Sequence, residues 1–177
     1  MQDCAYRSLA AVLAVFVITT SAAADPIAQK RVDPLRYAGR WYEVARLPNK
    51  LQANCVSVTA DWARGSDGVF DVTQTCHTGP AGSEDKTLRA SGRFVDTATS
   101  ATFRMEFLGG LIQRDYLIVD RADDYSWCML TMPNPKYLWI MSRKPDVSPT
   151  EKAALVAHAH GLGYDVTKLV FDNAPSA

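Results

Sequence analysis

The histidines are the side chains of this sequence best suited to bind a transition metal. His77 stands alone, and His158 and His160 are two residues apart, so on a helix they point in different directions. The sequence contains neither a Cys-x-x-Cys pair nor a His-Glu-x-x-His motif. We therefore expect no metal site and no cofactor.

Cys128 is a second candidate for chemistry, as a nucleophile. It lies in a strand-like segment and has no base recognisable from the sequence, so we expect a buried apolar thiol. The sequence has no phosphate-binding loop and no Gly-x-Ser-x-Gly motif. These features favour a protein that is not an enzyme. Catalysis through Cys128 or through the acid Glu43 is the alternative, because a fold alone never excludes it.

Composition excludes several classes of protein. The 177 residues include 19 Lys+Arg and 19 Asp+Glu, so the formal net charge is zero and nucleic acid is not an expected partner. Hydrophobic residues make up 47% of the chain and charged residues 21%. These values are typical of an ordinary globular protein and not of a disordered chain, a collagen or a coiled coil.

Residues 1–24 are typical of a secretory signal peptide. A basic residue precedes the apolar run Leu9–Ile18, and Ala22–Ala24 supply a small-residue cleavage site. The run is too short for a membrane span, which needs roughly 20 apolar residues. Cys4 precedes the run instead of following the cleavage point, so we expect no lipid anchor. The prediction is an exported protein with a single domain over residues 25–177.

Cys55 and Cys76 are the expected disulfide, because exported proteins keep disulfides and these two lie near the outer ends of neighbouring predicted strands. Matching the apolar faces of the two strands pairs Trp62 with Phe70 and Val56 with Cys76. That register turns Cys55 to the opposite face. The predicted bridge therefore requires a one-residue bulge.

Short alternating apolar runs separated by turn residues dominate the chain after its N-terminal region, which predicts antiparallel strands. The runs are Trp41–Leu47, Val56–Ala63, Val69–Cys76, Thr87–Val95, Ala101–Leu108, Tyr116–Asp120, Trp127–Met132 and Tyr137–Ser142. Eight strands at this spacing predict a closed up-and-down β-barrel. Ser148-Pro149-Thr150-Glu151 is a capping box, so one helix from Thr150 to His160 should pack outside the barrel. The run Lys168–Phe171 adds a strand or packs the tail.

Three motifs in order resemble the lipocalins, and within them the bacterial lipocalins and their apolipoprotein-D-like relatives. They are Gly39-Arg40-Trp41-Tyr42-Glu43-Val44-Ala45-Arg46, Arg114-Asp115-Tyr116 and Tyr137-Leu138-Trp139-Ile140-Met141-Ser142-Arg143. The resemblance extends from about Asp33 to Phe171, and it implies that Arg143 packs over Trp41 at a plugged end of the barrel. A guanidinium over an indole is stabilising by about 0.5 to 2 kcal/mol. Gly39 would allow a tight backbone entry beneath the ring.

The resemblance implies a cup that carries a small hydrophobic ligand, a fatty acid or a lysophospholipid in the bacterial members. Period-two counting gives a mostly apolar wall with a few polar groups, as is usual for a ligand pocket. The expected ligand-facing residues are Glu43, Val58, Ala60, Trp62, Phe103, Met105, Phe107, Tyr116, Ile118, Tyr137, Trp139 and Met141. Glu43 must be paired, hydrated or protonated in such a cavity. Alternation alone does not distinguish a filled barrel from a hollow one.

The resemblance also sets the expected location and partners. We expect a periplasmic protein that serves the lipids of the cell envelope, with the outer membrane as a surface it contacts. Leu51, Leu108, Leu111 and Ile112 lie in two predicted mouth loops and could touch lipid or a second copy, so both a monomer and a homodimer stay open. A haem or tetrapyrrole binder is a further alternative.

Overall fold

The computed structural model describes residues 30–79 and 85–172. The predicted signal peptide, residues 1–24, and Cys4 lie outside the described residues. None of the helices within the described ranges is long and apolar enough to cross a membrane.

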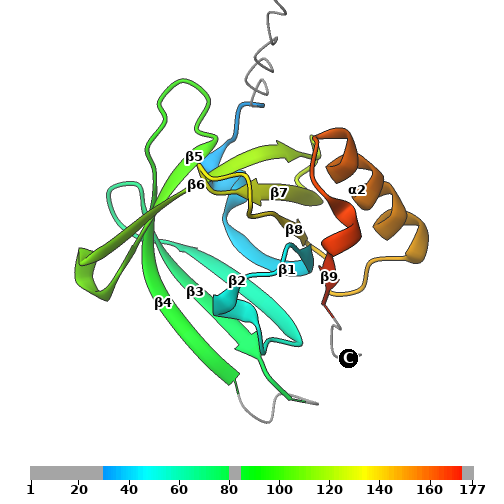
Figure 1. Ribbon diagram of the computed structural model, residues 1–177. Helices are drawn as coiled ribbons and strands as arrows, with labels where there is room; N and C mark the ends of the chain where they lie inside the picture. The colour runs from blue at the N-terminus through cyan, green and yellow to red at the C-terminus, as the bar shows by residue number, and fades with distance from the viewer. Residues whose placement is uncertain (1–29, 80–84, 173–177) are drawn as a thin grey trace, which may run out of the picture.

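Eight antiparallel strands form a closed barrel, and a ninth strand lies against β1 (Figure 1). From β2 to β8, strands that follow each other in the chain are neighbours in the sheet, and β1 pairs with both β8 and β2 to close the circle. The strands are β1 (Gly39–Arg46), β2 (Ser57–Arg64), β3 (Val69–His77), β4 (Asp85–Phe94), β5 (Thr102–Phe107), β6 (Ile112–Arg121), β7 (Trp127–Thr131), β8 (Trp139–Ser142) and β9 (Val170–Phe171). The predicted up-and-down barrel is confirmed.

Within residues 30–79 and 85–172, two α-helices and three short 3-10 helices accompany the strands. They are α1 (Pro34–Tyr37), η1 (Lys50–Gln52), η3 (Leu108–Gly110), α2 (Pro149–Gly161) and η4 (Val166–Lys168). The predicted capping box of α2 is present, because the Ser148 side chain accepts from the Glu151 amide and the Glu151 side chain accepts from the Ser148 amide. Figure 1 shows α2 packed on the outside of the barrel, beside β7 and β8. An apolar cluster with Leu155 and Ala159 of the helix and Met129 and Ile140 of the barrel fills that contact.

The irregular part of β1 changes which residues face inward. The pairing of β1 with β8 shifts between Glu43 and Ala45, so alternation along the strand is broken there. Trp41 and Glu43 face the barrel interior as expected. Strict alternation would put Ala45 on this face too, but it belongs to the outer cluster beneath α2, and Arg46 is buried.

The register between β2 and β3 differs from the expected one by two residues. Trp62 pairs with Val72 and not with Phe70, because the turn centres on Asp67 and Gly68, both at positive φ. The predicted disulfide Cys55–Cys76 is nevertheless present, with Cα atoms 5.3 Å apart. No bulge in β2 is needed, since Cys55 precedes the strand and its amide turns back to the Gln52 carbonyl.

Most strand boundaries differ from the prediction by one or two residues, and two of the differences lie near the mouth of the barrel. β6 begins at Ile112, four residues before the predicted Tyr116, so only residues 108–111 connect it to β5. β8 begins at Trp139, and Tyr137 lies in the loop before it. Both differences concern segments at the same end of the barrel.

Candidate ligand-binding site

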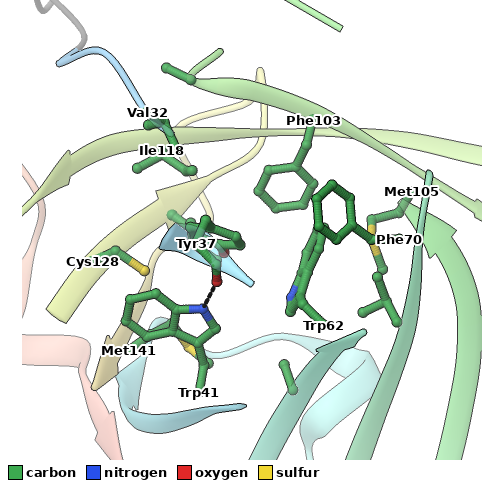
Figure 2. Close-up of a cluster of buried hydrophobic side chains, with 14 of the residues drawn as sticks. Val32, Tyr37, Trp41, Trp62, Phe70, Phe103, Met105, Ile118, Cys128 and Met141 are labelled. Atoms are coloured by element: carbon green, nitrogen blue, oxygen red, sulfur yellow. Dashed lines mark hydrogen bonds between the residues drawn. The ribbon is translucent and has the colours of Figure 1, made fainter. Parts of the chain in front are cut away.

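One end of the barrel is closed by the chain that precedes β1. The Val32 amide donates to the Thr99 carbonyl (2.7 Å), and the Asp33 amide donates to the Tyr125 hydroxyl (2.7 Å), so this segment crosses the loops at that end. Tyr37, at the end of α1, is 1% exposed. Its ring contacts those of Trp41, Trp62 and Phe103 at centroid distances of 5.2, 5.1 and 5.9 Å (Figure 2). It also contacts the ring of Phe94, at 5.6 Å. A layer of aromatic rings therefore forms a floor.

Arg143, just after β8, lies over the outer side of this floor. Its Cζ atom is 3.6 Å from the centroid of the Trp41 ring. Its nitrogens also donate, at 2.8 to 2.9 Å, to the backbone carbonyls of Arg36, Tyr37, Ala38 and Arg40. Gly39 has a φ of +99°, and a Cβ atom there would lie 3.3 Å from Arg143 Nη1. The glycine thus makes room for the guanidinium, and the predicted stacking of Arg143 on Trp41 is present.

A cavity of about 360 Å³ lies above the aromatic floor. Its wall is mainly apolar, and it extends up to the loop that joins β1 to β2. Nine of the residues predicted to face a ligand line it: Glu43, Val58, Ala60, Trp62, Phe103, Met105, Tyr116, Trp139 and Met141. The barrel is therefore partly filled near its closed end and hollow above it.

Three residues of the predicted set do not line the cavity. Ile118 is buried below the floor, beside Val32 (Figure 2). Phe107 is buried in the inner apolar cluster away from the cavity. Tyr137 lies in the loop before β8, where its ring stacks on that of the cavity-lining Trp139 with an interplanar angle of 3°. Tyr137 thus lies next to the cavity wall at the mouth, and its contact with a ligand stays a prediction.

Several lining residues were missed because sequence reasoning looked for apolar faces. Gln74 of β3 and Lys86 of β4 point inward near the mouth, with Leu88 next to them. Gln52 and Leu51 reach the cavity from η1, in a loop that strand alternation does not describe. Period two along β3, which puts Gln74 on the face of the buried Phe70 and Val72, was the available signal.

Glu43, the acid of the cavity wall, belongs to a buried polar network. Its Oε1 accepts from Arg46 Nη1 (2.8 Å), and its Oε2 accepts from Gln52 Nε2 (2.7 Å). Arg46 also pairs with Asp172, which follows β9, and Asp172 Oδ2 accepts from the Val58 amide (2.7 Å). Glu43, Arg46 and Asp172 are each less than a tenth exposed. The network joins the first strand to the end of the described chain.

Two carboxyl groups share one guanidinium in this network, and this sets their protonation. Burial, and next the charge of Asp172, raises the pKa of Glu43 to about 8 despite Arg46. Burial raises the pKa of Asp172 to about 6, while Arg46 and the Val58 amide oppose the rise. Burial and the mutual repulsion of the two carboxyl groups therefore favour one proton on the pair, which leaves one negative charge to balance Arg46. The group then has no net charge.

The loop from β1 to β2 is held over the mouth from two sides. Gln52 Oε1 accepts from Trp139 Nε1 and from Asn49 Nδ2, both at 2.7 Å, while its amide nitrogen donates to Glu43. Arg46 Nη2 donates to the Gln52 and Cys55 carbonyls at 3.0 and 2.9 Å. The Cys55–Cys76 disulfide then ties the loop to β3. The mouth is therefore narrowed by a loop with fixed anchors.

The remaining candidates for chemistry lie away from the cavity. Cys128 is a free, fully buried thiol below the floor, and burial raises its pKa well above the ordinary value (Figure 2). His77 pairs with Asp85 at 2.7 Å, and none of the three histidines is part of the cavity wall. Within residues 30–79 and 85–172 there is no cluster of three metal-ligating side chains.

Comparison with known proteins places the chain in a family. Residues 32–174 match the lipocalin-like domain. The outer membrane lipoprotein Blc of Citrobacter freundii is 27% identical over 173 residues, which cover 96% of this chain and 97% of that protein. Temperature-induced lipocalin-1 of Arabidopsis thaliana is 31% identical over 139 residues, which cover 76% of this chain and 75% of that protein.

Solved structures show the same fold. Insecticyanin from the tobacco hornworm Manduca sexta gives a TM-score of 0.66 at 14% identity, with 82% of each chain covered. The cockroach allergen Per a 4 gives a TM-score of 0.63 at 18% identity, covering 83% of this chain and 91% of that one. With a matching domain over most of its length and the closed barrel in place, this chain belongs to the lipocalin family.

Proposed function

We propose that this lipocalin carries a single-chain lipid, a fatty acid or a lysophospholipid, inside its barrel. The observation that carries the proposal is the space of about 360 Å³ between the aromatic floor and the anchored loop. At about 30 Å³ for a water-sized group, it takes roughly a dozen such groups, which fits one acyl chain and not two. Burying about a dozen methylenes gains roughly 10 kcal/mol before ordering costs, enough for micromolar binding.

The proposed place of action is the bacterial envelope, in the periplasm. Residues 1–24 have the pattern of an export signal, and a structural disulfide at Cys55 and Cys76 suits an oxidising compartment. The relatives named outer membrane lipoprotein Blc support an envelope location. We propose that the protein serves the upkeep of envelope lipids by holding chains that have left the bilayer.

Native mass spectrometry and a variant that fills the cavity test the carrier proposal. The protein purified from its host should retain a lipid-sized mass at one per barrel, and the delipidated protein should bind dodecanoate in calorimetry. Ala60→Leu adds volume to the cavity wall and should weaken binding of dodecanoate strongly. Ala63→Leu, an exposed position on the same strand, is the matched control and should bind as the wild type.

Two results would contradict the carrier proposal. One is a wild-type protein that neither retains a lipid nor binds dodecanoate or its neutral analogue dodecanol. The other is an Ala60→Leu variant, folded by circular dichroism, that binds with unchanged affinity. If the bound lipid were released in a chemically altered form, the protein would instead be an enzyme.

We further propose that the rim of the mouth meets the membrane from which lipid is taken. Leu51, Leu108 and Leu111 are 91%, 71% and 81% exposed and lie in the loops β1–β2 and β5–β6. Such exposed apolar groups are typical of a surface that contacts lipid. Replacing Leu108 and Leu111 by aspartate should reduce sedimentation with phospholipid vesicles. Leu35→Asp, an exposed leucine at the closed end, is the control.

A further inference from the structure

One carboxyl group and one ammonium group line the cavity, those of Glu43 and Lys86, and they differ in their partners. Both oxygens of Glu43 already accept hydrogen bonds, from Arg46 and from Gln52. With one proton on its two carboxyl groups, the buried network of Glu43, Arg46 and Asp172 has no net charge. Lys86 forms no ion pair with any residue that the structure describes. The wall at β1 is therefore electrically neutral, whereas the wall at β4 presents a cation that has no ion-pair partner in the part of the chain that the structure describes.

The register of β3 and β4 places Lys86 at the mouth, facing inward. Lys86 is directly opposite Cys76, which lines the cavity through its disulfide. Gln74 is two residues deeper on β3, opposite Leu88, so its side chain is a diagonal neighbour of Lys86 and within reach of the same ligand group. Its amide makes no hydrogen bond to another side chain or backbone group among the described residues. Two donors without a protein partner among the described residues thus lie side by side at the rim.

We propose that Lys86 and Gln74 form a subsite for the acidic group of a single-chain amphiphile, whose tail lies on the aromatic floor. The inference rests on the proposed carrier function and adds to it the charge and the orientation of the ligand. An ammonium and an amide N–H are the donors that carboxylates and phosphates accept from.

The polarity of the wall sets this orientation. Below Gln74 the cavity is bounded by Trp62, Phe103 and Met105, which offer only apolar contact to a chain. The acidic group therefore remains at the rim, where Lys86 and water solvate it, and burial of the charge is avoided. A ligand with a cationic end at the same place would meet Lys86 and be repelled.

Matched ligands of one chain length separate the charge from the tail. Calorimetry on the full delipidated protein compares dodecanoate with dodecanol at neutral pH. In Lys86→Gln, the dissociation constant of dodecanoate should rise about threefold to fivefold, and in Lys86→Glu about tenfold or more. The dissociation constant of dodecanol should not change in either variant. Arg89→Gln is the control. Arg89 is an exposed cation of the same strand, and it lies opposite Thr73 on the outer face of the sheet, so this variant should bind both ligands as the wild type does.

The possible results of these measurements test the carrier proposal and the subsite proposal separately. If the wild type binds neither ligand, the carrier proposal fails. If it binds both, and Lys86→Gln weakens both equally or neither, the subsite is refuted while the carrier proposal stands. Gln74→Leu gives a second, independent variant, and unchanged binding of dodecanoate there would remove Gln74 from the subsite and refute the paired arrangement. Dodecyl phosphate, compared with dodecanoate in the same variants, shows whether a phosphate or a carboxylate is the better ligand.

Discussion

Replacing Glu43 by glutamine should change how the stability of the barrel depends on pH. Burial and the charge of Asp172 raise the pKa of Glu43 to about 8, whereas the ordinary value for the unfolded chain is 4.5. Between these limits the native protein binds more protons than the unfolded chain, so the free energy of unfolding must fall as the pH rises. Glutamine has no such proton to lose, and its amide imitates the protonated acid.

The slope gives the size of the effect. One extra proton on the native state corresponds to about 1.4 kcal/mol per pH unit, or about 4 kcal/mol across three units, as an upper bound. Glutamine also loses one acceptor towards Arg46 or Gln52, which costs roughly 1 kcal/mol at every pH. The lost acceptor shifts the free energy of unfolding equally at every pH, whereas the proton changes its dependence on pH, so one measurement separates the two effects.

Urea denaturation monitored by tryptophan fluorescence from about pH 5 to about pH 8 measures this slope. The wild type should lose stability with rising pH relative to Glu43→Gln, and the two curves should diverge steadily. Glu106→Gln, a glutamate on the outer face of β5, is the matched control and should follow the wild type. Parallel curves for the wild type and Glu43→Gln would refute the assignment of the proton to Glu43.

Three further changes have expected costs. Arg143→Lys removes the planar fork that binds four carbonyls and covers the indole, and should lower the free energy of unfolding by about 3 kcal/mol in urea. Gly92→Ala places a Cβ atom 2.8 Å from the Trp62 ring and should cost about 1 to 3 kcal/mol, seen as a lower Tm. Replacing Cys55 and Cys76 together by serine opens a link across 21 residues and should cost about 3 kcal/mol in urea.

Each of these three measurements has its own control. Arg40→Lys alters an exposed arginine of β1, near the same end of the barrel, and should cost less than Arg143→Lys. Gly161→Ala, where an added Cβ meets nothing within 4 Å, should not destabilise, in contrast to the change at Gly92. A reducing agent should lower the stability of the wild type and leave the double serine variant unchanged. Equal behaviour of variant and control in any pair would contradict the contact assigned to it.

The barrel could be predicted because each strand and turn is specified by residues that are close together in the sequence. Alternation and turn residues define the strands, and a capping box with Pro149 defines where α2 begins. The stacking of Arg143 on Trp41 followed from motifs that stand at the two ends of the barrel sequence. The pairing of Cys55 with Cys76 followed from the order of the strands, although the observed register between β2 and β3 differs from the predicted one by two residues.

The polar part of the site was not predictable in the same way. The irregularity in β1 turns Arg46 into the barrel wall, and alternation gives no sign of where such a shift occurs. Asp172 reaches Arg46 from 126 residues further along the chain, so no spacing rule connects them. Gln74 and Lys86 were overlooked because a polar residue on an inward face is recognised only once the interior is known to be hollow.

The contact of Arg143 with the start of the barrel also bears on how the chain folds. Its hydrogen bonds to the carbonyls of residues 36–40 span 103 to 107 positions in the sequence. Closing so large a loop costs chain entropy that local contacts do not offset. The contacts of Arg143 with residues 36–40 should therefore form among the last steps of folding. During synthesis, the first strand is thus without one neighbour until the eighth has emerged. Until then the backbone of β1 is an unpaired edge with which other chains can form strand pairs, so aggregation at that edge has to be prevented by something outside the unfinished barrel.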